Sequence, residues 1–238
     1  IALSESMKRQ LMEVTSIAED RIVVIPQACE KIYESPIEDK YLHGRFQDKF
    51  TVIFTGNISP AQSFDTMIQS ALILKERGYN DINWIIVGDG MSRKDVEASV
   101  KKLELTDCFT FEGNHPITDM PKYTELADVL VGCLVKSSLL EATIPAKVMS
   151  YIASGKPIVL AMDGEVQQLV NDTIRCGHAG PTGDAIILAE NILKIYKLSS
   201  KDRQLMGERA KKYYKKYFKR DILLGKLSNF IFDIRNEV

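Results

Sequence analysis

Short apolar runs alternate along this chain with longer amphipathic stretches, and this alternation limits the possible folds more than any other feature. A strand that is apolar throughout is buried on both faces, which is typical of a parallel sheet covered by helices. Runs of this kind occupy residues 21–25, 50–55, 83–87, 108–111, 128–133 and 157–161. Helical patterns occupy residues 63–77, 92–103, 120–127 and 146–153. Because crossovers between parallel strands are right-handed, this order predicts an α/β fold: a Rossmann-like, doubly wound parallel sheet of about six strands.

The chain becomes mainly helical after residue 183 and ends in a predicted helical tail. The helical patterns there cover residues 185–196, 202–218 and 221–235. Residues 201–220 are rich in Lys and Arg, and their aromatic residues recur at helical spacing: Tyr213, Tyr214, Tyr217 and Phe218. This pattern suits either a basic amphipathic surface for anionic lipid or a helix with its aromatics in the core and its lysines in water. We favour the second interpretation.

Composition limits the classes of protein to consider. The chain has 238 residues, of which 45% are hydrophobic, enough for one large or two small cores. The net charge of −1 provides no general attraction to nucleic acid or membrane, and no apolar run reaches 18 residues. The four cysteines form no CxxC pair, which favours reduced thiols over a disulfide framework or a zinc site. We expect a cytoplasmic protein, at the inner face of the membrane if the basic tail binds lipid. The start at Ile1 leads us to expect an excised domain.

The segment of residues 144–160, IPAKVMSYIASGKPIVL, contains the clearest local signals. Pro145 suits the first turn of a helix, Gly155 a helix end, and Pro157 prevents a restart before the next strand. Free N–H groups at a helix start attract anions, and Lys147 adds a formal positive charge. The segment therefore suits a diphosphate held without metal. The alternative is ordinary packing, with Lys147 in solvent.

Ligands of doubly wound sheets bind beyond the carboxyl ends of the strands. The loops expected there are residues 56–63, 88–91, 112–119, 134–145 and 162–165. In the first of them, Gly56 would let the backbone approach a phosphate, and Asn57, Ser59 and Gln62 could donate hydrogen bonds. One glycine alone makes neither a P-loop nor a dinucleotide fingerprint.

The other loops leave two interpretations open at each place. Residues 88–90 suit a tight turn, which we favour, or an approach to a ligand. His115 is either a ligand contact or a solvated loop histidine. Residues 163–165 suit either a polar ligand or a turn with a helix N-cap. No Asp-x-Asp pair and no nucleophile motif occurs, so no catalytic residue is assigned, no metal is expected, and Lys147 with backbone amides would neutralise a diphosphate.

Six segments in fixed order carry a resemblance to a known family. They are IVVIPQ, FTGNISPAQSFDTMI, WIIVGDG, FTFEGNHPITDMPKYTELADVLV, IPAKVMSYIASGKPIVLAMDGE and DRQLMGERAKKYYKKYF. Over about residues 4–220 the chain resembles the C-terminal, donor-binding domain of GT-B glycosyltransferases, the "group 1" family. Within that family it is similar to bacterial O-antigen and capsule enzymes of the N-acetyl-L-fucosamine transferase type.

The resemblance implies a nucleotide-sugar donor, commonly a UDP-sugar, retention of anomeric configuration and no cofactor or metal. It also implies which residues bind the donor. Gly56, Asn57, Gln62, Pro145, Ala146 and Lys147 would lie at the diphosphate, Asn114, His115, Pro116 and Ile117 at the base through backbone groups, Ser150 at the ribose, and Gly164 and Glu165 near the sugar.

Two departures from the family pattern bear on activity. Many members carry Arg and Lys at the positions of Asn57 and Gln62. The second glutamate of the family's Glu-x7-Glu pair falls at Ser150, and the first falls near Ala142, with Glu141 one position away. Losing bidentate ribose recognition would cost about 1–3 kcal/mol without another group. A degenerate, non-catalytic scaffold or partner subunit is therefore the alternative, and nucleotide-sugar epimerases of the same fold are a third interpretation.

The resemblance also divides the chain. Residues 1–20 would be an N-terminal helix or linker from a missing acceptor domain, residues 21–200 the Rossmann-like nucleotide-sugar-binding domain, and residues 201–238 the helical tail. Because a GT-B enzyme reacts in the cleft between two Rossmann-like domains, we expect this chain alone to bind the donor weakly or not at all and to transfer no sugar. The expected partners are the nucleotide-sugar and the N-terminal acceptor domain, together with a membrane surface if the tail binds lipid, and no nucleic acid.

Overall fold

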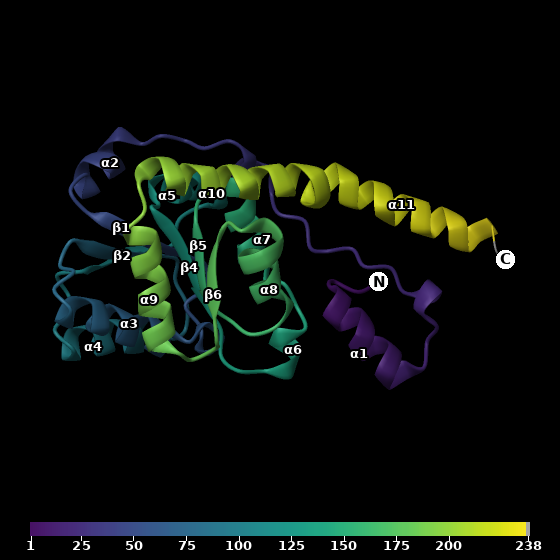
Figure 1. The fold of residues 1–238 in the computed structure, drawn as a ribbon, viewed down its shortest axis with the longest axis horizontal. Helices are drawn as coiled ribbons and strands as arrows, with labels where there is room; N and C mark the ends of the chain where they lie inside the picture. The colour runs from purple at the N-terminus through teal and green to yellow at the C-terminus, as the bar shows by residue number, and fades with distance from the viewer. Residues whose placement is uncertain (237–238) are drawn as a thin grey trace.

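A computed structural model describes residues 1–236, and at its centre is a six-stranded sheet with helices on both faces (Figure 1). The strands are β1 Phe50–Thr55, β2 Ile82–Val87, β3 Phe109–Gly113, β4 Val129–Cys133, β5 Ile158–Ala161 and β6 Gly177–Gly180. Their order is β3-β2-β1-β4-β5-β6, and every neighbouring pair is parallel. The predicted doubly wound, Rossmann-like fold is confirmed.

Two apolar layers fill the space between the sheet and the helices. The helices are α1 Glu5–Thr15, α2 Lys40–Phe46, α3 Phe64–Glu76, α4 Arg93–Lys102, α5 Met120–Leu126, α6 Ser138–Glu141, α7 Ala146–Ser154, α8 Glu165–Gln168, α9 Ala185–Tyr196, α10 Ser200–Tyr213 and α11 Arg220–Asn236. Side chains alternate across a strand, so Val52 and Phe54 of β1 pack with α3, α4 and α9, whereas Ile53 packs with α5, α7 and α10. The four inner strands β1, β2, β4 and β5 are thus buried on both sides, whereas the edge strands β3 and β6 are partly exposed.

The tail packs on the sheet layers through α10 and then leaves them. Gly207 of α10 lies so close to α7 that a Cβ there would be 2.0 Å from the carbonyl oxygen of Gly155. Tyr214 and Phe218, in the π-helical turn after α10, are buried, whereas Tyr217 is exposed. The interpretation that places tail aromatics in the core is confirmed for these two. Beyond them, α11 extends away from the sheet (Figure 1).

Two predictions about strands were wrong. Residues 21–25 form no strand of the sheet, and Val24 makes only an isolated bridge to Ala2. This apolar run lies outside the sheet, so only the N-terminal residues are available to pair with it. The sixth strand is instead β6, whose sequence GHAG has no apolar run. Gly177 is required there because a Cβ would lie 1.7 Å from the carbonyl oxygen of Ile158.

The N-terminal helix predicted within residues 1–20 is present as α1, which has no buried residue and lies to one side of the sheet, as does the far end of α11 (Figure 1). Among residues 1–236, none of the helices combines the length and the apolar character needed to cross a bilayer.

Candidate functional site

The sheet changes its direction of winding between β1 and β4, and the two strands separate toward their carboxyl ends. They pair only at Val52↔Val129 and Ile53↔Leu130. Beyond these pairs the hydroxyl of Tyr151, from α7, accepts a hydrogen bond from the N–H of Thr55 at 3.0 Å and donates to the carbonyl of Val131 at 3.2 Å. In open parallel sheets such a switch point is where ligand crevices form. The candidate site is therefore the end of the sheet between β1 and β4.

Lys147 reaches this switch point from the first turn of α7. Its Nζ lies 3.7 Å from the centroid of the Phe54 ring and donates a hydrogen bond to Oε1 of Gln62. A Cβ on Gly56, the residue after β1, would be 3.5 Å from this amine, and one on Gly132 of β4 would be 3.7 Å from its Cδ. The amine thus lies between the ends of β1 and β4, in the loop region predicted for ligands. The interpretation that leaves Lys147 in solvent is wrong.

The surroundings of Lys147 make its charge sensitive to a ligand. Desolvation lowers the pKa of this amine to about 7. The nearby Cys133 thiol is fully buried, and the same effect raises its pKa to about 12, so it is neutral. Gln62 is the hydrogen-bond partner of the amine among residues 1–236, and the ion pairs found in that part of the chain do not include Lys147. An anion entering the crevice would meet an ammonium group that carboxylates have not neutralised.

The loops after β1 and β2 are held together through glycines. The N–H of Gly56 donates to the carbonyl of Val87 at 2.9 Å, and a Cβ on Gly88 would lie 1.9 Å from the carbonyl oxygen of Gly56. Both glycines have positive φ, +133° and +141°. A Cβ on Gly90 would lie 2.3 Å from Oδ1 of Asn57, whose side chain therefore rests on that turn. Gly88 adopts the positive φ of the tight-turn interpretation and Gly90 does not; the turn closes just beyond, where the N–H of Arg93 donates to the carbonyl of Gly90 at 3.1 Å.

The loop after β3 presents its backbone, while its histidine turns back to the fold. Nε2 of His115 lies 2.9 Å from the hydroxyl of Tyr123 and 3.1 Å from the carbonyl oxygen of Glu112. Asn114, Pro116 and Ile117 are exposed. This arrangement suits contact with a ligand through backbone groups, which stays a prediction.

The loop after β5 is bound to the N-terminal helix. The carboxylate of Glu165 accepts hydrogen bonds from the N–H of Ser6 at 2.7 Å and of Glu5 at 3.4 Å, in the first turn of α1. Gly164 has a φ of +95°, and a Cβ there would lie 2.0 Å from the carbonyl oxygen of Glu141. Both residues lie at the carboxyl edge of the sheet, beside the β4 loop. The role of Glu165 in capping α1 was not visible in the sequence, because the partners are some 160 positions apart. Its contact with a sugar stays a prediction.

Ser150 lies one helical turn beyond Lys147 on α7 and has a neighbour that the sequence did not indicate. The phenol of Tyr33 interacts with the side chain of Ser150. Burial raises the pKa of this phenol, and the interaction with Ser150 partly opposes that rise. Tyr33 belongs to the short helical turn Lys31–Glu34. At the position where the resemblance implies a carboxylate, this chain therefore has a pair of hydroxyl groups.

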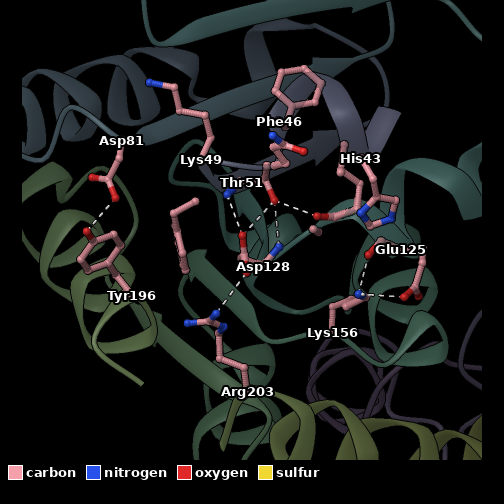
Figure 2. Close-up of a pocket in the computed structure, with 14 residues that line it drawn as sticks. His43, Phe46, Lys49, Thr51, Asp81, Glu125, Asp128, Lys156, Tyr196 and Arg203 are labelled. Atoms are coloured by element: carbon pink, nitrogen blue, oxygen red, sulfur yellow. Dashed lines mark hydrogen bonds and ion pairs between the residues drawn. The ribbon is translucent and has the colours of Figure 1, made fainter. Parts of the chain in front are cut away.

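A separate hollow of about 500 Å³ lies at the opposite, amino edge of the sheet (Figure 2). Four of its charged side chains form two ion pairs, and Asp81 accepts a hydrogen bond from a tyrosine. Arg203 of α10 lies 3.3 Å from Asp128, Lys156 lies 3.3 Å from Glu125, and the hydroxyl of Tyr196 donates to Asp81 at 2.7 Å. The contacts of Arg203 and Tyr196 attach α10 and α9 to the sheet, and Lys49, an exposed lysine of this hollow, donates to the carbonyl of Asn80 at 3.3 Å.

The predicted site residues therefore fall into one central group and two flanking groups. Gly56, Gln62 and Lys147 meet at the switch point, at the start of α7 with Pro145 and Ala146. Residues 114–117 follow β3 on one side, and Gly164 and Glu165 follow β5 on the other. Asn57 rests beside Gly90, at the turn after β2.

Comparison with known proteins identifies the family of this chain. The sequence model of the family described as "Glycosyl transferases group 1" matches residues 38–213. A 2-deoxystreptamine glucosyltransferase of Streptomyces kanamyceticus is 29% identical over 192 residues, which cover 73% of this chain and 49% of that protein. The chain thus spans about half the length of this curated relative.

Solved structures share the fold at low identity. Anabaena Alr3699/HepE in complex with UDP-glucose superposes with a TM-score of 0.81 at 16% identity, over 98% of this chain and 63% of that one. The C-terminal domain of a glycosyl transferase group 1 family protein (LpcC) from Francisella tularensis superposes with a TM-score of 0.62 at 17% identity, over 79% of this chain and 97% of that one.

Proposed function

Since this chain belongs to the group 1 glycosyltransferases, we propose that it is the donor-binding half of an enzyme that transfers a sugar from a nucleotide-sugar, a UDP-sugar in particular. The observation that carries this proposal is the Lys147 amine between the ends of β1 and β4, next to Gly56 and free of ion pairs with residues 1–236. The UDP-glucose bound by a structural neighbour supports the choice of nucleotide.

In the proposed reaction the acceptor hydroxyl oxygen bonds to the anomeric carbon, the bond from that carbon to the diphosphate breaks, and the hydroxyl proton leaves with the diphosphate. The departing diphosphate gains negative charge as this bond breaks. A protonated Lys147 and the free N–H groups at the start of α7 would stabilise that charge, and groups fixed in advance do so without reorganisation. Neutralisation by these groups is the basis for proposing independence from metal. We propose retention of the anomeric configuration on the basis of the family resemblance.

The remaining parts of the donor would occupy the flanking loops. Residues 114–117 would contact the base through their exposed backbone, Ser150 the ribose with help from Tyr33, and Gly164 and Glu165 the sugar. With a donor bound, Glu165 would either keep its hydrogen bonds to α1 and contact the sugar through its backbone, or exchange those bonds for hydrogen bonds to sugar hydroxyls.

The acceptor would come from a second domain. The chain spans about half of its curated relative, and α1 exposes apolar side chains, Val14 at 80% and, just beyond the helix, Ile17 at 46%. We propose that residues 1–20 lead from that domain, that residues 21–200 bind the donor, and that residues 201–238 form a helical tail, which would meet the inner face of the membrane only if its basic segment binds lipid. Transfer would then require both domains.

We also propose a biological role for the enzyme. The order of the sequence segments supports a bacterial surface polysaccharide enzyme of the N-acetyl-L-fucosamine transferase type, acting in the cytoplasm. The curated relative bears the name of a glucosyltransferase. A panel of UDP-sugars therefore has to include both glucose and N-acetylated amino sugars.

Calorimetric titration of this chain with UDP and UDP-sugars tests the proposal. We expect saturable binding that Lys147→Ala weakens at least tenfold, because removing a charged hydrogen-bond donor costs about 1.5–3 kcal/mol. Lys49→Ala removes an exposed lysine at the amino edge of the sheet and is the matched control. Equal affinity of the wild type and Lys147→Ala for UDP would show that Lys147 does not bind the phosphates.

The alternative is a scaffold or partner subunit without catalysis, and the serine at position 150 favours it, because two hydroxyl groups replace a carboxylate. This alternative predicts a folded chain that binds neither UDP nor any UDP-sugar at millimolar concentration. Turnover by the chain together with its acceptor domain would exclude it.

A further inference from the structure

The Lys147 amine is held by neutral groups on its protein side. The Phe54 ring lies beneath it at 3.7 Å, and the amide oxygen of Gln62 accepts one of its protons. Gly56 and Gly132 have no side chains, and the Lys147 side chain passes close to both. A Cβ at Gly56 would contact its Nζ, and a Cβ at Gly132 would contact its Cδ. An ammonium group has three donors, so donors remain for a ligand after the bond to Gln62.

Gln62 is itself fixed by backbone hydrogen bonds. It ends the 3₁₀ turn Pro60–Gln62, and its N–H donates to the carbonyl of Ser59 at 3.0 Å. The carbonyl of Ala61 accepts the N–H of Val135 at 3.0 Å, which ties this turn to the chain just beyond β4. The backbone of Gln62 therefore has a defined place relative to both strands of the switch point, and from there its side-chain amide meets the Lys147 amine.

We propose that Gln62 is the positioning residue of Lys147: its neutral amide oxygen holds the amine over Phe54, facing the crevice, and leaves the whole positive charge for a donor diphosphate. A flexible lysine side chain otherwise gains entropy and hydration by turning to water. A carboxylate in the place of Gln62 would hold the amine equally well but would neutralise it. This inference rests on the proposed function, because the ligand of the positioned Lys147 amine is the diphosphate of the donor.

The titration of Lys147 reports on this arrangement, because few charged groups surround it. The elements packed against the amine contribute Phe54 from β1, Gln62 from the following turn and Cys133 from β4, and of these only Cys133 titrates. Its buried thiol stays neutral in the physiological range. A change at position 62 would therefore act directly on the protonation of Lys147.

Two substitutions at position 62 separate positioning from simple contact with the ligand. Gln62→Leu removes the acceptor at similar volume, and we expect the pKa of Lys147 to fall and the affinity for UDP to drop about tenfold. Gln62→Glu supplies a charged acceptor, and we expect the pKa of Lys147 to rise while UDP affinity again drops, because the carboxylate repels phosphate. Gln47→Leu, at an exposed position on the amino edge, is the control.

The measurement is the NMR titration of the Lys147 side chain in the ligand-free chain, followed by calorimetry with UDP. Opposite pKa shifts in the leucine and glutamate variants with weaker UDP binding in both would support the inference. An unchanged Lys147 titration in Gln62→Leu would overturn it. If the wild-type chain bound no UDP, the proposed function would fail, and the ligand-free titration would still decide whether Gln62 controls the amine.

Discussion

The carboxylate of Glu165 accepts a hydrogen bond of 2.7 Å from the backbone N–H of Ser6, and this contact joins the loop after β5 to the first turn of α1. The N-terminus of a helix carries partial positive charge and unpaired N–H groups, which an acidic side chain stabilises. In this chain the acidic group is far from the helix in sequence. The position of α1 is thereby linked to the loop predicted to meet the donor sugar.

Replacing Glu165 should release α1. We expect Glu165→Gln to reduce the stability of this helix by about 1 kcal/mol, since it removes the charge from a capping contact. Hydrogen exchange of residues 5–15 should become faster, with the amides of the sheet unchanged. Glu13→Gln, at an exposed position near the other end of α1, is the control. Equal exchange in α1 of the Glu165 variant and the wild type would show that the contact does not hold the helix.

Removing the Tyr151 hydroxyl should destabilise the whole fold. Tyr151→Phe leaves the buried N–H of Thr55 and carbonyl of Val131 without this partner, which costs about 1–3 kcal/mol. Urea unfolding monitored by circular dichroism measures the difference. Tyr41→Phe, at a side chain that is 75% exposed, should change stability by less than about 0.5 kcal/mol. A Tyr151 variant as stable as its control would argue against the hydroxyl as the bridge between β1 and β4.

A side chain at Gly88 should disturb both stability and binding. The Cβ of Gly88→Ala would meet the carbonyl oxygen of Gly56 at 1.9 Å, at a φ of +141°, so the two loops must move apart. We expect a loss of more than about 2 kcal/mol of unfolding free energy. Thermal unfolding and UDP titration would measure the two effects.

Gly44→Ala is the matched control for Gly88→Ala. Gly44 lies in α2 with nothing within 4 Å of an added Cβ, and alanine should stabilise that helix by about 0.5–1 kcal/mol. Similar effects of the two substitutions would contradict the close contact between the two loops.

Much of the sheet was predictable because its signals are local. Runs such as β1 and β2 are mostly apolar and are buried throughout. Pro145 marks the start of α7, and Gly155, which adopts a φ of +71°, marks its end. β6 could not be found in this way, because GHAG is a strand only through its neighbour β5 and the close approach at Gly177.

The part of the site that the sequence did not predict depends on contacts between distant residues. Tyr33 meets Ser150, and Ser6 meets Glu165, across more than a hundred positions, with no periodicity to indicate either pair. Lys147 was found because helix starts and lysines are local signals. Its burial over Phe54, which sets its pKa, required the three-dimensional packing.

The burial of Lys147 should lower stability below neutral pH. Its pKa in the folded chain is lowered to about 7, so between pH 7 and the ordinary lysine value the unfolded chain binds more protons than the folded one. The free energy of unfolding attributable to this group therefore increases as pH rises above 7, and is lowest below 7. We expect Lys147→Met to exceed the wild type in stability at pH 6, to lose part of that advantage by pH 9, and to lose the rest only near the ordinary lysine pKa. A difference that does not vary with pH, in urea unfolding at several pH values, would contradict the shifted pKa.

The pH dependence of UDP affinity, compared between the wild type and Lys147→Ala, tests the central claim most directly. A neutral amine must take up a proton to bind phosphate, so the Kd of the wild type should rise with pH above about 7, approaching tenfold per pH unit, as expected for one proton. The alanine variant should bind more weakly and lack this rise. Equal affinities with the same pH profile would contradict a donor site built around Lys147.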